Sequence, residues 1–332
     1  MNGSSLYFVA PHQVEVVDEP IGAPAADQML VQTIVSAISS GSELLVYRGE
    51  VPADMPLDAS IPGLTERFTL PSKYGYSAVG RVIAAGADVS REWLDRLVFS
   101  LHPHESHFLA SAQDLEPVPA GVSPEDAALF SNIETAVTFV MDGRPVVGER
   151  VAVFGQGVVG LLTTALLAKF PLSSLVTVDR HPLRRRLSTG LGAHEVLDPA
   201  AGLELKNNSF DLTFELSGTP AALDQAIAVT GFAGRVVIGS WYGDRPARLH
   251  LGGAFHRSRM QLLSSQVSTI DPALTGRWTT DRRRQLSWDM LCDVGPSRLV
   301  THRFEFSDAA NAYELLDRHP DEAVQVLLTY GA

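Results

Sequence analysis

A glycine-rich turn in the middle of the chain has the residue types and spacing of a pyrophosphate-binding loop. The turn, GQGVVG at 155–160, follows the strand-like run RVAVF and opens the helical run VVGLLTTALLAKF. Gly155 would permit a tight turn, Gly157 would let the backbone approach a pyrophosphate, and Gly160 would let helix and strand pack closely. The phosphates would bind N–H groups at the start of the helix. The predicted contributors are Gly155, Gln156, Gly157, Val158, Val159 and Gly160.

An acidic residue at the end of the next strand-like run indicates which dinucleotide would bind. Asp179 closes SLVTVD, 19 positions after Gly160, and would accept hydrogen bonds from a ribose 2′-hydroxyl. NAD(H) is therefore favoured, because this carboxylate would repel a 2′-phosphate. Arg180, Arg184 and Arg185 follow closely, so NADP(H) stays open if Asp179 turns away. The competing interpretation is a glycine turn that binds nothing.

Imidazole groups in the segment HPHESH, residues 102–107, could move a proton. A histidine with a pKa of about 6.5 exchanges protons at neutral pH, which makes His102 a candidate acid or base. His102 and His104 would share one face if the preceding strand, DRLVFSL, continued through Pro103. The alternative is a loop whose histidines face solvent.

The elements that would carry these residues change in type along the chain. Strand-like runs separated by Gly and Pro, such as VQTIVSAI and GRVIAA, fill the N-terminal third. From 150 to 240, apolar runs with little alternation are interleaved with helical runs. That pattern predicts an α/β fold with βαβ units and an open parallel sheet buried on both faces. SDAANAYELLDRH then indicates an amphipathic helix before a last strand, EAVQVLLTY.

With these motifs in place, the chain resembles the medium-chain dehydrogenase/reductase superfamily over nearly its whole length. ISSGSELLVYRG at 38–49 is similar to the family's Cys-Gly-Thr-Asp segment, and KYGYSAVGRVIAAG at 73–86 is similar to its Gly-His-Glu segment. The same two segments are similar to the branch that contains bacteriochlorophyllide hydroxyethyl dehydrogenase, which also lacks the usual zinc ligands. The resemblance implies a GroES-like, β-rich catalytic domain at 1–125 and 266–332 and a Rossmann domain, a doubly wound parallel sheet, at 126–265.

The resemblance also implies which residues carry catalysis. Ser42 falls at the position of a proton-relay hydroxyl, and His102 falls where family members line the substrate pocket. Tyr76, as a neutral phenol, could donate a hydrogen bond to a carbonyl while hydride arrives. Glu134 matches a position where some members place a carboxylate or cysteine ligand. A plain helix-face carboxylate is the alternative for Glu134.

Further cofactor contacts are expected around the nicotinamide. Thr138 matches a family position that packs on that ring, with simple helix packing as the alternative. Gly239 and Ser240, at the end of the strand-like run GRVVIGS, would flank the same ring. Ser217, which follows DLTFEL, is another cofactor-binding candidate.

The usual zinc ligands are missing from the segments that resemble the family. Ser40, Tyr76 and Ser77 occupy the three zinc-site positions, so no zinc is expected. The lone Cys292 cannot build the family's cysteine-rich structural zinc site, and we expect it to be a buried small apolar residue. A relocated site stays open as an alternative, since two imidazoles and a carboxylate are acceptable zinc ligands. Its members would be His102, His104 and Glu134.

Composition excludes some classes of function. With 26 Lys+Arg against 38 Asp+Glu, the net charge of −12 disfavours nucleic acid, and Arg184–Arg186 and Arg282–Arg284 are expected to be solvated helix faces. No apolar run reaches the roughly 18 residues of a membrane span. The first residues lack a basic segment followed by an apolar one, so no secretory signal is expected. A cytoplasmic location fits the single cysteine.

The favoured function is a zinc-independent NAD(P)-dependent oxidoreductase acting on a carbonyl/secondary-alcohol pair of a small molecule. Reduction of an enone or quinone, and a dinucleotide-binding sensor without catalysis, are the alternatives. The resemblance implies a homodimer. Trp241, Tyr242 and the segment 54–70 are candidates for shaping a large substrate pocket.

Overall fold

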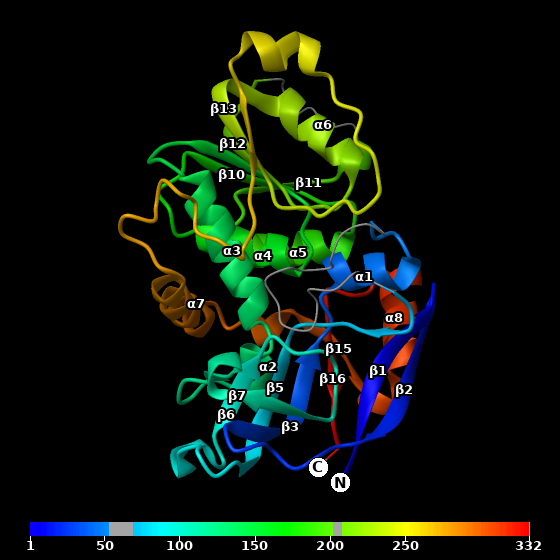
Figure 1. The fold of residues 1–332 in the computed structure, drawn as a ribbon. Coiled ribbons are helices and arrows are strands. Elements are labelled where there is room, and N and C mark those ends of the chain that lie inside the picture. Colours follow the sequence, from blue (N-terminus) through cyan, green and yellow to red (C-terminus); the bar gives the residue numbers. More distant parts are fainter. Residues whose placement is uncertain (53–68, 202–207, 332) are drawn as a thin grey trace. The chain divides into compact units, whose positions relative to one another are not determined.

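A computed structural model describes residues 1–52, 69–201 and 208–331 and divides the chain into two compact units. Unit 1 comprises Met1–Ser131 and Gly295–Ala332, and unit 2 comprises Asn132–Val294 (Figure 1). The family resemblance implied boundaries at 125/126 and 265/266 instead. Most of the difference is the stretch that contains helix α7 (Thr280–Val294), which contacts α4 in unit 2. The domain assignment of 266–294 therefore stays a prediction.

Unit 1 is rich in antiparallel strands. One sheet has the order β2-β1-β4, and the other has the order β15-β16-β3-β5-β6-β8 with β7 paired to β3. Only β15 and β16 pair in parallel among the described strands of this unit. The strands are β1 (Asn2–Ala10), β2 (Gln13–Pro20), β3 (Gln28–Ala37), β4 (Ser72–Lys73), β5 (Ala78–Ala85), β6 (Leu97–Ser100), β7 (His107–Ser111), β8 (Glu116–Pro117), β15 (Val300–Glu305) and β16 (Gln325–Thr329).

Short helices complete unit 1, and apolar side chains of its larger sheet form a core. Buried residues of β3, β5, β6 and β7 cluster there, including Met29, Val82, Val98 and Phe108. Helix α1 (Ser40–Arg48) follows β3 closely and ends at Gly49, whose φ of 72° gives the left-handed C-cap that glycine adopts without strain. The other helices of this unit are α2 (Pro124–Ala127) and α8 (Ala309–Arg318).

Unit 2 is a parallel α/β sheet with the strand order β11-β10-β9-β12-β13-β14 (Figure 1). Its strands are β9 (Arg150–Phe154), β10 (Ser174–Val178), β11 (Glu195–Leu197), β12 (Phe210–Glu215), β13 (Thr230–Ile238) and β14 (Gln261–Ser264). Its helices are α4 (Val158–Leu167), α5 (Pro182–Gly190), α6 (Pro220–Val229) and α7, together with most of α3 (Phe130–Gly143).

The apolar runs of unit 2 became buried strands for the reason that their pattern predicts. The four residues Val151–Phe154 of β9 are all buried, as a central parallel strand covered on both faces requires. Helix α4 is likewise buried along most of its length. The predicted fold class, a β-rich domain joined to a doubly wound parallel sheet, is therefore confirmed.

Two expectations from the sequence are wrong in detail. Strand β6 ends at Ser100, so it does not continue through Pro103 and does not align His102 with His104 on one face. Cys292 is exposed on α7, because the apolar side of this helix is formed by neighbours such as Trp288 and Leu291. In the part of the chain that the structure describes, no helix is both long and apolar enough to cross a bilayer.

A lysine in unit 1 holds the short strand β4, which leads into the segment carrying Tyr76. The Lys73 ammonium binds Glu19 at 2.7 Å and Glu105 at 2.5 Å. The hydroxyl of Tyr7 donates to the other oxygen of Glu19 at 2.5 Å. These bonds tie β1, β2, β4 and the 102–107 segment together, so they fix where the chain enters the candidate site.

Glu19→Gln should lower the thermal unfolding midpoint at neutral pH by about 2–4 °C if the network contributes about 1 kcal/mol. Hydrogen bonds from Lys73 and then Tyr7 hold the pKa of Glu19 at about 2, below its ordinary 4.5. A group with a depressed folded pKa stabilises the protein above its unfolded pKa, and that stabilisation is lost as pH falls through the folded value. The difference between wild type and variant should therefore shrink from pH 4.5 towards pH 2.

Thermal scans at a series of pH values would measure this difference. The matched control is Glu15→Gln on the same strand, whose carboxylate bonds only the exposed Gln13 side chain among the contacts described. A midpoint difference for Glu19→Gln that stays constant down to pH 2 would contradict the assignment.

Candidate active site

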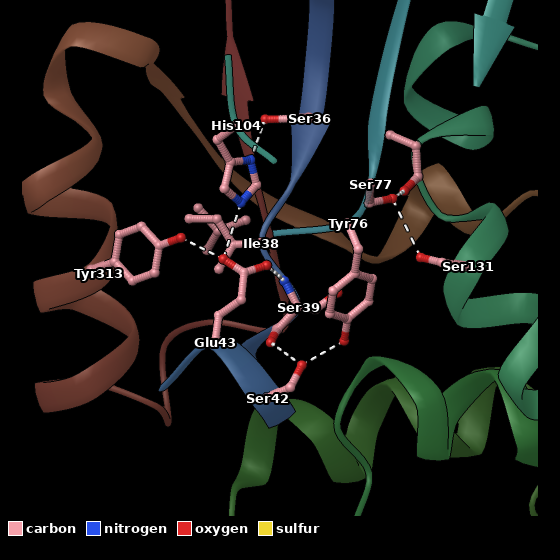
Figure 2. Close-up of polar contacts among 12 residues, drawn as sticks. Ser36, Ile38, Ser39, Ser42, Glu43, Tyr76, Ser77, His104, Ser131 and Tyr313 are labelled. Carbon is pink, nitrogen blue, oxygen red and sulfur yellow. Dashed lines mark hydrogen bonds and ion pairs between the residues drawn. The ribbon is translucent and has the colours of Figure 1, made fainter. Parts of the chain in front are cut away.

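Two hydroxyl groups from separate segments meet in unit 1. Ser42 lies in α1, Tyr76 lies between β4 and β5, and their oxygens are 2.5 Å apart (Figure 2). Ser42 Oγ is also 3.4 Å from the carbonyl oxygen of Ser39. Ser42 and Tyr76 are half-buried, whereas the neighbouring Glu43 and Ser77 are buried. The pair is therefore the part of this polar group that solvent or a ligand can reach.

The two hydroxyls can act as a single hydrogen-bond donor. When Ser42 turns its one proton from the Ser39 carbonyl to Tyr76, Tyr76 can donate its phenolic proton to another acceptor, such as a substrate carbonyl oxygen. A phenol with an ordinary pKa of about 10 is protonated at neutral pH, so it acts as an acid or donor rather than a base. The sequence resemblance had named both residues as catalytic candidates, and the structure brings their hydroxyls together, whereas their catalytic roles stay predictions.

A buried carboxylate lies next to the pair. Glu43 accepts a hydrogen bond from the backbone N–H of Ser39 at 2.7 Å, one from His104 Nε2 at 3.0 Å, and one from the hydroxyl of Tyr313 (Figure 2). Neither Glu43 nor His104 has exposed side-chain surface. Sequence reasoning treated His104 only as a possible metal ligand. The signal it missed was the carboxylate at the head of the apolar run ELLVY, which a helix buries only with donors around it.

The residues at the family's zinc positions do not fit a zinc ion. Ser77 Oγ is buried, donates to the carbonyl of Ala128 at 2.5 Å and accepts from Ser131 at 3.3 Å (Figure 2). Ser40 and Tyr76 offer only hydroxyls, whereas protein zinc sites use thiolate, imidazole or carboxylate. Across residues 1–52, 69–201 and 208–331, no three His, Cys, Asp or Glu side chains are placed to hold a metal ion.

The structure places His102 in a different group from the hydroxyl pair. His102 Nε2 is 3.0 Å from Glu105, and its ring stacks on Phe108 with centroids 4.0 Å apart. Burial alone would raise the pKa of Glu105, but hydrogen bonds and charges from His102 and Lys73 outweigh it and leave that pKa lowered. An ionised Glu105 thus orients His102. The role of His102 in proton transfer stays a prediction.

Glu134, in unit 2, is held by an arginine. Arg283 donates to Glu134 Oε1 from Nη2 at 2.9 Å and from Nε at 3.3 Å, and both residues are buried. The expectation that Arg282–Arg284 form a solvated face is therefore wrong for Arg283, because this guanidinium pairs a carboxylate on α3. The alternative metal set of His102, His104 and Glu134 draws residues from both units, so it stays a prediction.

Arg283→Met should destabilise the protein by about 3–5 kcal/mol, because the buried Glu134 carboxylate loses its hydrogen-bonded counter-charge and keeps only Arg284, 3.8 Å away. The double variant Glu134→Gln/Arg283→Met should recover much of that loss. Urea unfolding would measure both. Arg284→Met is the matched control, since Arg284 is more exposed and 3.8 Å from the same oxygen. Equal losses in the single and double variants would contradict this account.

The glycine-rich turn has the geometry of a phosphate-binding loop. Gly155 has a φ of 88°, and a Cβ on it would lie 2.4 Å from the Ser217 Cα. A Cβ on Gly160 would lie 2.0 Å from the carbonyl oxygen of Gly155. By contrast, no atom lies within 4 Å of the Cβ position of Gly157, and no side chain caps the start of α4 at Val158. This open cradle of backbone N–H groups fits a pyrophosphate.

The acid after β10 lies against the same turn. Asp179 accepts hydrogen bonds from the backbone N–H of Gln156 at 2.7 Å and of His181 at 2.8 Å, one on each oxygen. Arg185 donates to the Asp179 carbonyl at 2.8 Å and pairs with Asp198 at 3.0 Å. Arg180 Nε contacts His181 at 3.0 Å and is exposed. The carboxylate therefore points to the turn and is held there by two backbone groups.

The other cofactor candidates of unit 2 gather where β12 and β13 end. Ser217 donates to Glu215 Oε1 at 2.5 Å, and Ser240 accepts from the N–H of Gly218 at 2.8 Å. The N–H of Gly239 donates to the Glu215 carbonyl at 3.1 Å. Sequence reasoning missed Glu215 itself, which is buried.

Two more side chains of unit 2 are occupied within the unit. Tyr242, expected to shape a substrate pocket, donates its hydroxyl to Glu215, and burial together with the Glu215 charge raises the pKa of Tyr242. Thr138 is buried and donates to the Glu134 carbonyl at 2.9 Å, so its contact with a nicotinamide stays a prediction. Of the pocket segment 54–70, residues 54–68 lie outside the described residues.

No model of a protein family matches the chain. Individual relatives do match it. D-guloside 3-dehydrogenase of Escherichia coli K12 is 22% identical over 350 residues, which covers 98% of this chain and 99% of that protein. (R,R)-butanediol dehydrogenase of Bacillus subtilis is 27% identical over 272 residues, which covers 72% of this chain and 76% of that protein.

Solved structures share the fold over the full length. A protein described as a short chain alcohol dehydrogenase, rspB of E. coli CFT073, was crystallised with NADH and superposes with a TM-score of 0.77 at 18% identity, covering 99% of both chains. The 2R,3R-butanediol dehydrogenase of B. subtilis superposes with a TM-score of 0.78 at 20% identity, covering 98% of this chain and 99% of its own. At these identities the superpositions establish the fold alone.

Proposed function

Since the chain belongs to the medium-chain dehydrogenase/reductase superfamily, we propose that it is an NAD(H)-dependent, zinc-independent oxidoreductase for a carbonyl/secondary-alcohol pair. The observation that carries the proposal is the Ser42–Tyr76 hydroxyl pair. Tyr76, Ser40 and the buried Ser77 stand at the positions that the family resemblance assigns to the zinc site. The bound nicotinamide supplies or accepts the hydride. The residues of the chain bind the dinucleotide and handle the proton.

Tyr76 donates its hydroxyl proton to the substrate oxygen while that oxygen gains negative charge. Ser42 donates in turn to Tyr76 Oη, and this second bond stabilises the developing phenolate. At neutral pH the resting phenol is protonated, which is the form that reduction of a carbonyl requires, whereas oxidation of an alcohol would require the phenolate as base. Correct orientation of the reacting groups supplies much of the rate.

Unit 2 supplies the dinucleotide site in this proposal. The backbone at Gly157 and the start of α4 would hold the pyrophosphate, and Asp179 would accept hydrogen bonds from the ribose hydroxyls. Both Asp179 oxygens already accept backbone N–H groups, yet each retains a further lone pair for a ribose hydroxyl. Because the carboxylate does not turn away from the loop, a 2′-phosphate would meet a negative charge.

Asp179→Ser should lower kcat/KM with NADH by about 10- to 100-fold, the loss expected when hydrogen bonds of about 1.5–3 kcal/mol to a charged group are removed. The value with NADPH should stay equal or rise, since the repulsive carboxylate is gone. Initial rates with each cofactor would measure the two ratios. Thr189→Ser, on an exposed part of α5, is the control. A wild-type preference for NADPH would contradict the proposed choice.

The test of the activity compares a saturated ketone with its enone, cyclohexanone with 2-cyclohexen-1-one, in NADH oxidation. Reduction of the saturated ketone supports the carbonyl/alcohol proposal, and turnover of the enone alone indicates a double-bond reductase. Tyr76→Phe should lower kcat by about 10²- to 10⁴-fold, as expected for loss of a general acid. Binding of NADH, followed by its fluorescence, should be unchanged.

Metal content separates the zinc-independent enzyme from a conventional one. Mass spectrometry of protein purified without chelators or a histidine tag should find far less than one zinc per chain, and 1,10-phenanthroline should leave the rate unchanged. Stoichiometric zinc together with inhibition by the chelator would overturn the proposal. NADH binding without turnover of any carbonyl would instead favour a sensor.

A further inference from the structure

The buried imidazole of His104 contacts both segments that carry the hydroxyl pair. We propose that His104 is a positioning residue, which sets the geometry of Ser42 and Tyr76 without touching the substrate. The effect of His104 on catalysis rests on the function proposed above. Its effect on the geometry of the hydroxyl pair can be tested separately, without substrate.

The link from His104 to Ser42 runs through Glu43. His104 Nε2 is 3.0 Å from Glu43 Oε2, and Glu43 Oε1 accepts the backbone N–H of Ser39 at 2.7 Å. The N–H of Ser42 donates to the Ser39 carbonyl at 3.0 Å in the first turn of α1. Since Ser39 immediately precedes this helix, the carboxylate that His104 orients fixes where α1 starts and where the Ser42 hydroxyl lies.

The link from His104 to Tyr76 runs through the backbone of Gly75. Gly75 has a φ of 116°, and a Cβ on it would lie 2.6 Å from Cδ2 and 2.7 Å from Nε2 of His104. The backbone therefore lies directly against the imidazole ring, at the residue before Tyr76. Only glycine permits both this φ and this approach without strain. The ring thus limits how far the Tyr76 segment can move inward.

The ring is itself held from its other side. His104 Nδ1 is 2.6 Å from Ser36 Oγ, which is 2.9 Å from the hydroxyl of Tyr330. One proton arrangement satisfies every group: Tyr330 donates to Ser36, Ser36 donates to Nδ1, and the Nε2–H donates to Glu43. The backbone carbonyl of His104 also accepts the N–H of Leu6 at 3.0 Å. A ring bonded at both nitrogens and buried keeps one orientation.

The chemistry distinguishes this role from that of His102. His104 has no exposed surface, so it cannot exchange a proton with a ligand while the fold stays closed. Its contribution is geometric, and it should affect kcat rather than the binding of NADH, which unit 2 performs. Replacing its Nε2–H donor by an amide N–H should preserve much of that contribution.

NMR of protein labelled with ¹³C at tyrosine Cζ tests the structural claim without any substrate. The Tyr76 signal is assigned by its loss in Tyr76→Phe, and Ser42→Ala gives the signal of a Tyr76 without its partner. His104→Leu should move the Tyr76 signal to that position, whereas His104→Gln should leave it near the wild-type value. Ser100→Ala, which removes another, partly buried hydrogen bond of unit 1, should leave the signal unmoved.

An unmoved Tyr76 signal in folded His104→Leu would overturn the inference. If that variant does not fold, Gly75→Ala provides the second test, because its methyl group presses on the ring from the opposite side. It should shift the Tyr76 signal, and an unshifted signal would again overturn the inference.

A double-mutant cycle tests the catalytic meaning on the cyclohexanone reaction. His104→Leu should lower kcat by nearly as much as Tyr76→Phe, and the double variant should be no slower than Tyr76→Phe alone. If the loss in kcat of the double variant equalled the product of the two single losses, His104 would not act through Tyr76, and the inference would be overturned. If the wild type reduces no carbonyl, the proposed function fails, yet the NMR result still decides whether His104 positions the pair.

Discussion

A carboxylate without access to water is stable only if donors or a counter-charge surround it, and that constraint shapes unit 1 around Glu43. Its donors come from the turn before α1, from the 102–107 loop and from α8. Each of these segments must be in place before the carboxylate is satisfied. The hydroxyl pair lies next to this arrangement. The hydrogen bonds that satisfy the buried Glu43 therefore also set the positions of Ser42 and Tyr76.

A similar constraint operates in unit 2 with backbone donors in place of side chains. The N–H groups of Gln156 and His181 hold Asp179, and the close approach of Gly155 to Ser217 fixes the turn next to it. The loop and the acid therefore hold their positions through contacts within the unit alone. The two units differ in this respect: long-range side-chain bonds order the hydroxyl pair, whereas a local turn orders the nucleotide site.

That difference explains what could be predicted from the sequence. The turn GQGVVG and Asp179 lie on consecutive elements of one βαβ unit, so their spacing carries the information. The fold class follows from the apolar runs of unit 2 and was confirmed. Ser42 and Tyr76 were identified only through the family resemblance, since their 34-residue separation has no local signature.

The residues that were missed have partners far away in the chain. Glu43 meets Tyr313 across 270 residues, and Ser36 meets Tyr330 across 294. Arg283 looks like its two arginine neighbours, and only Glu134, 149 residues away, distinguishes it. Cys292 was misjudged because composition predicts the average environment of a residue type and not the side of a helix on which it falls.

The ion pair between Glu134 and Arg283 constrains how this protein can evolve. The family resemblance matches position 134 to a possible ligand position, and here a buried guanidinium on α7 pairs with the carboxylate. Any substitution path that frees Glu134 to bind a ligand must remove Arg283. The intermediate that has lost only Arg283 leaves the buried carboxylate with Arg284 alone, which is more exposed and 3.8 Å away. Natural selection against that less stable intermediate would preserve the ion pair.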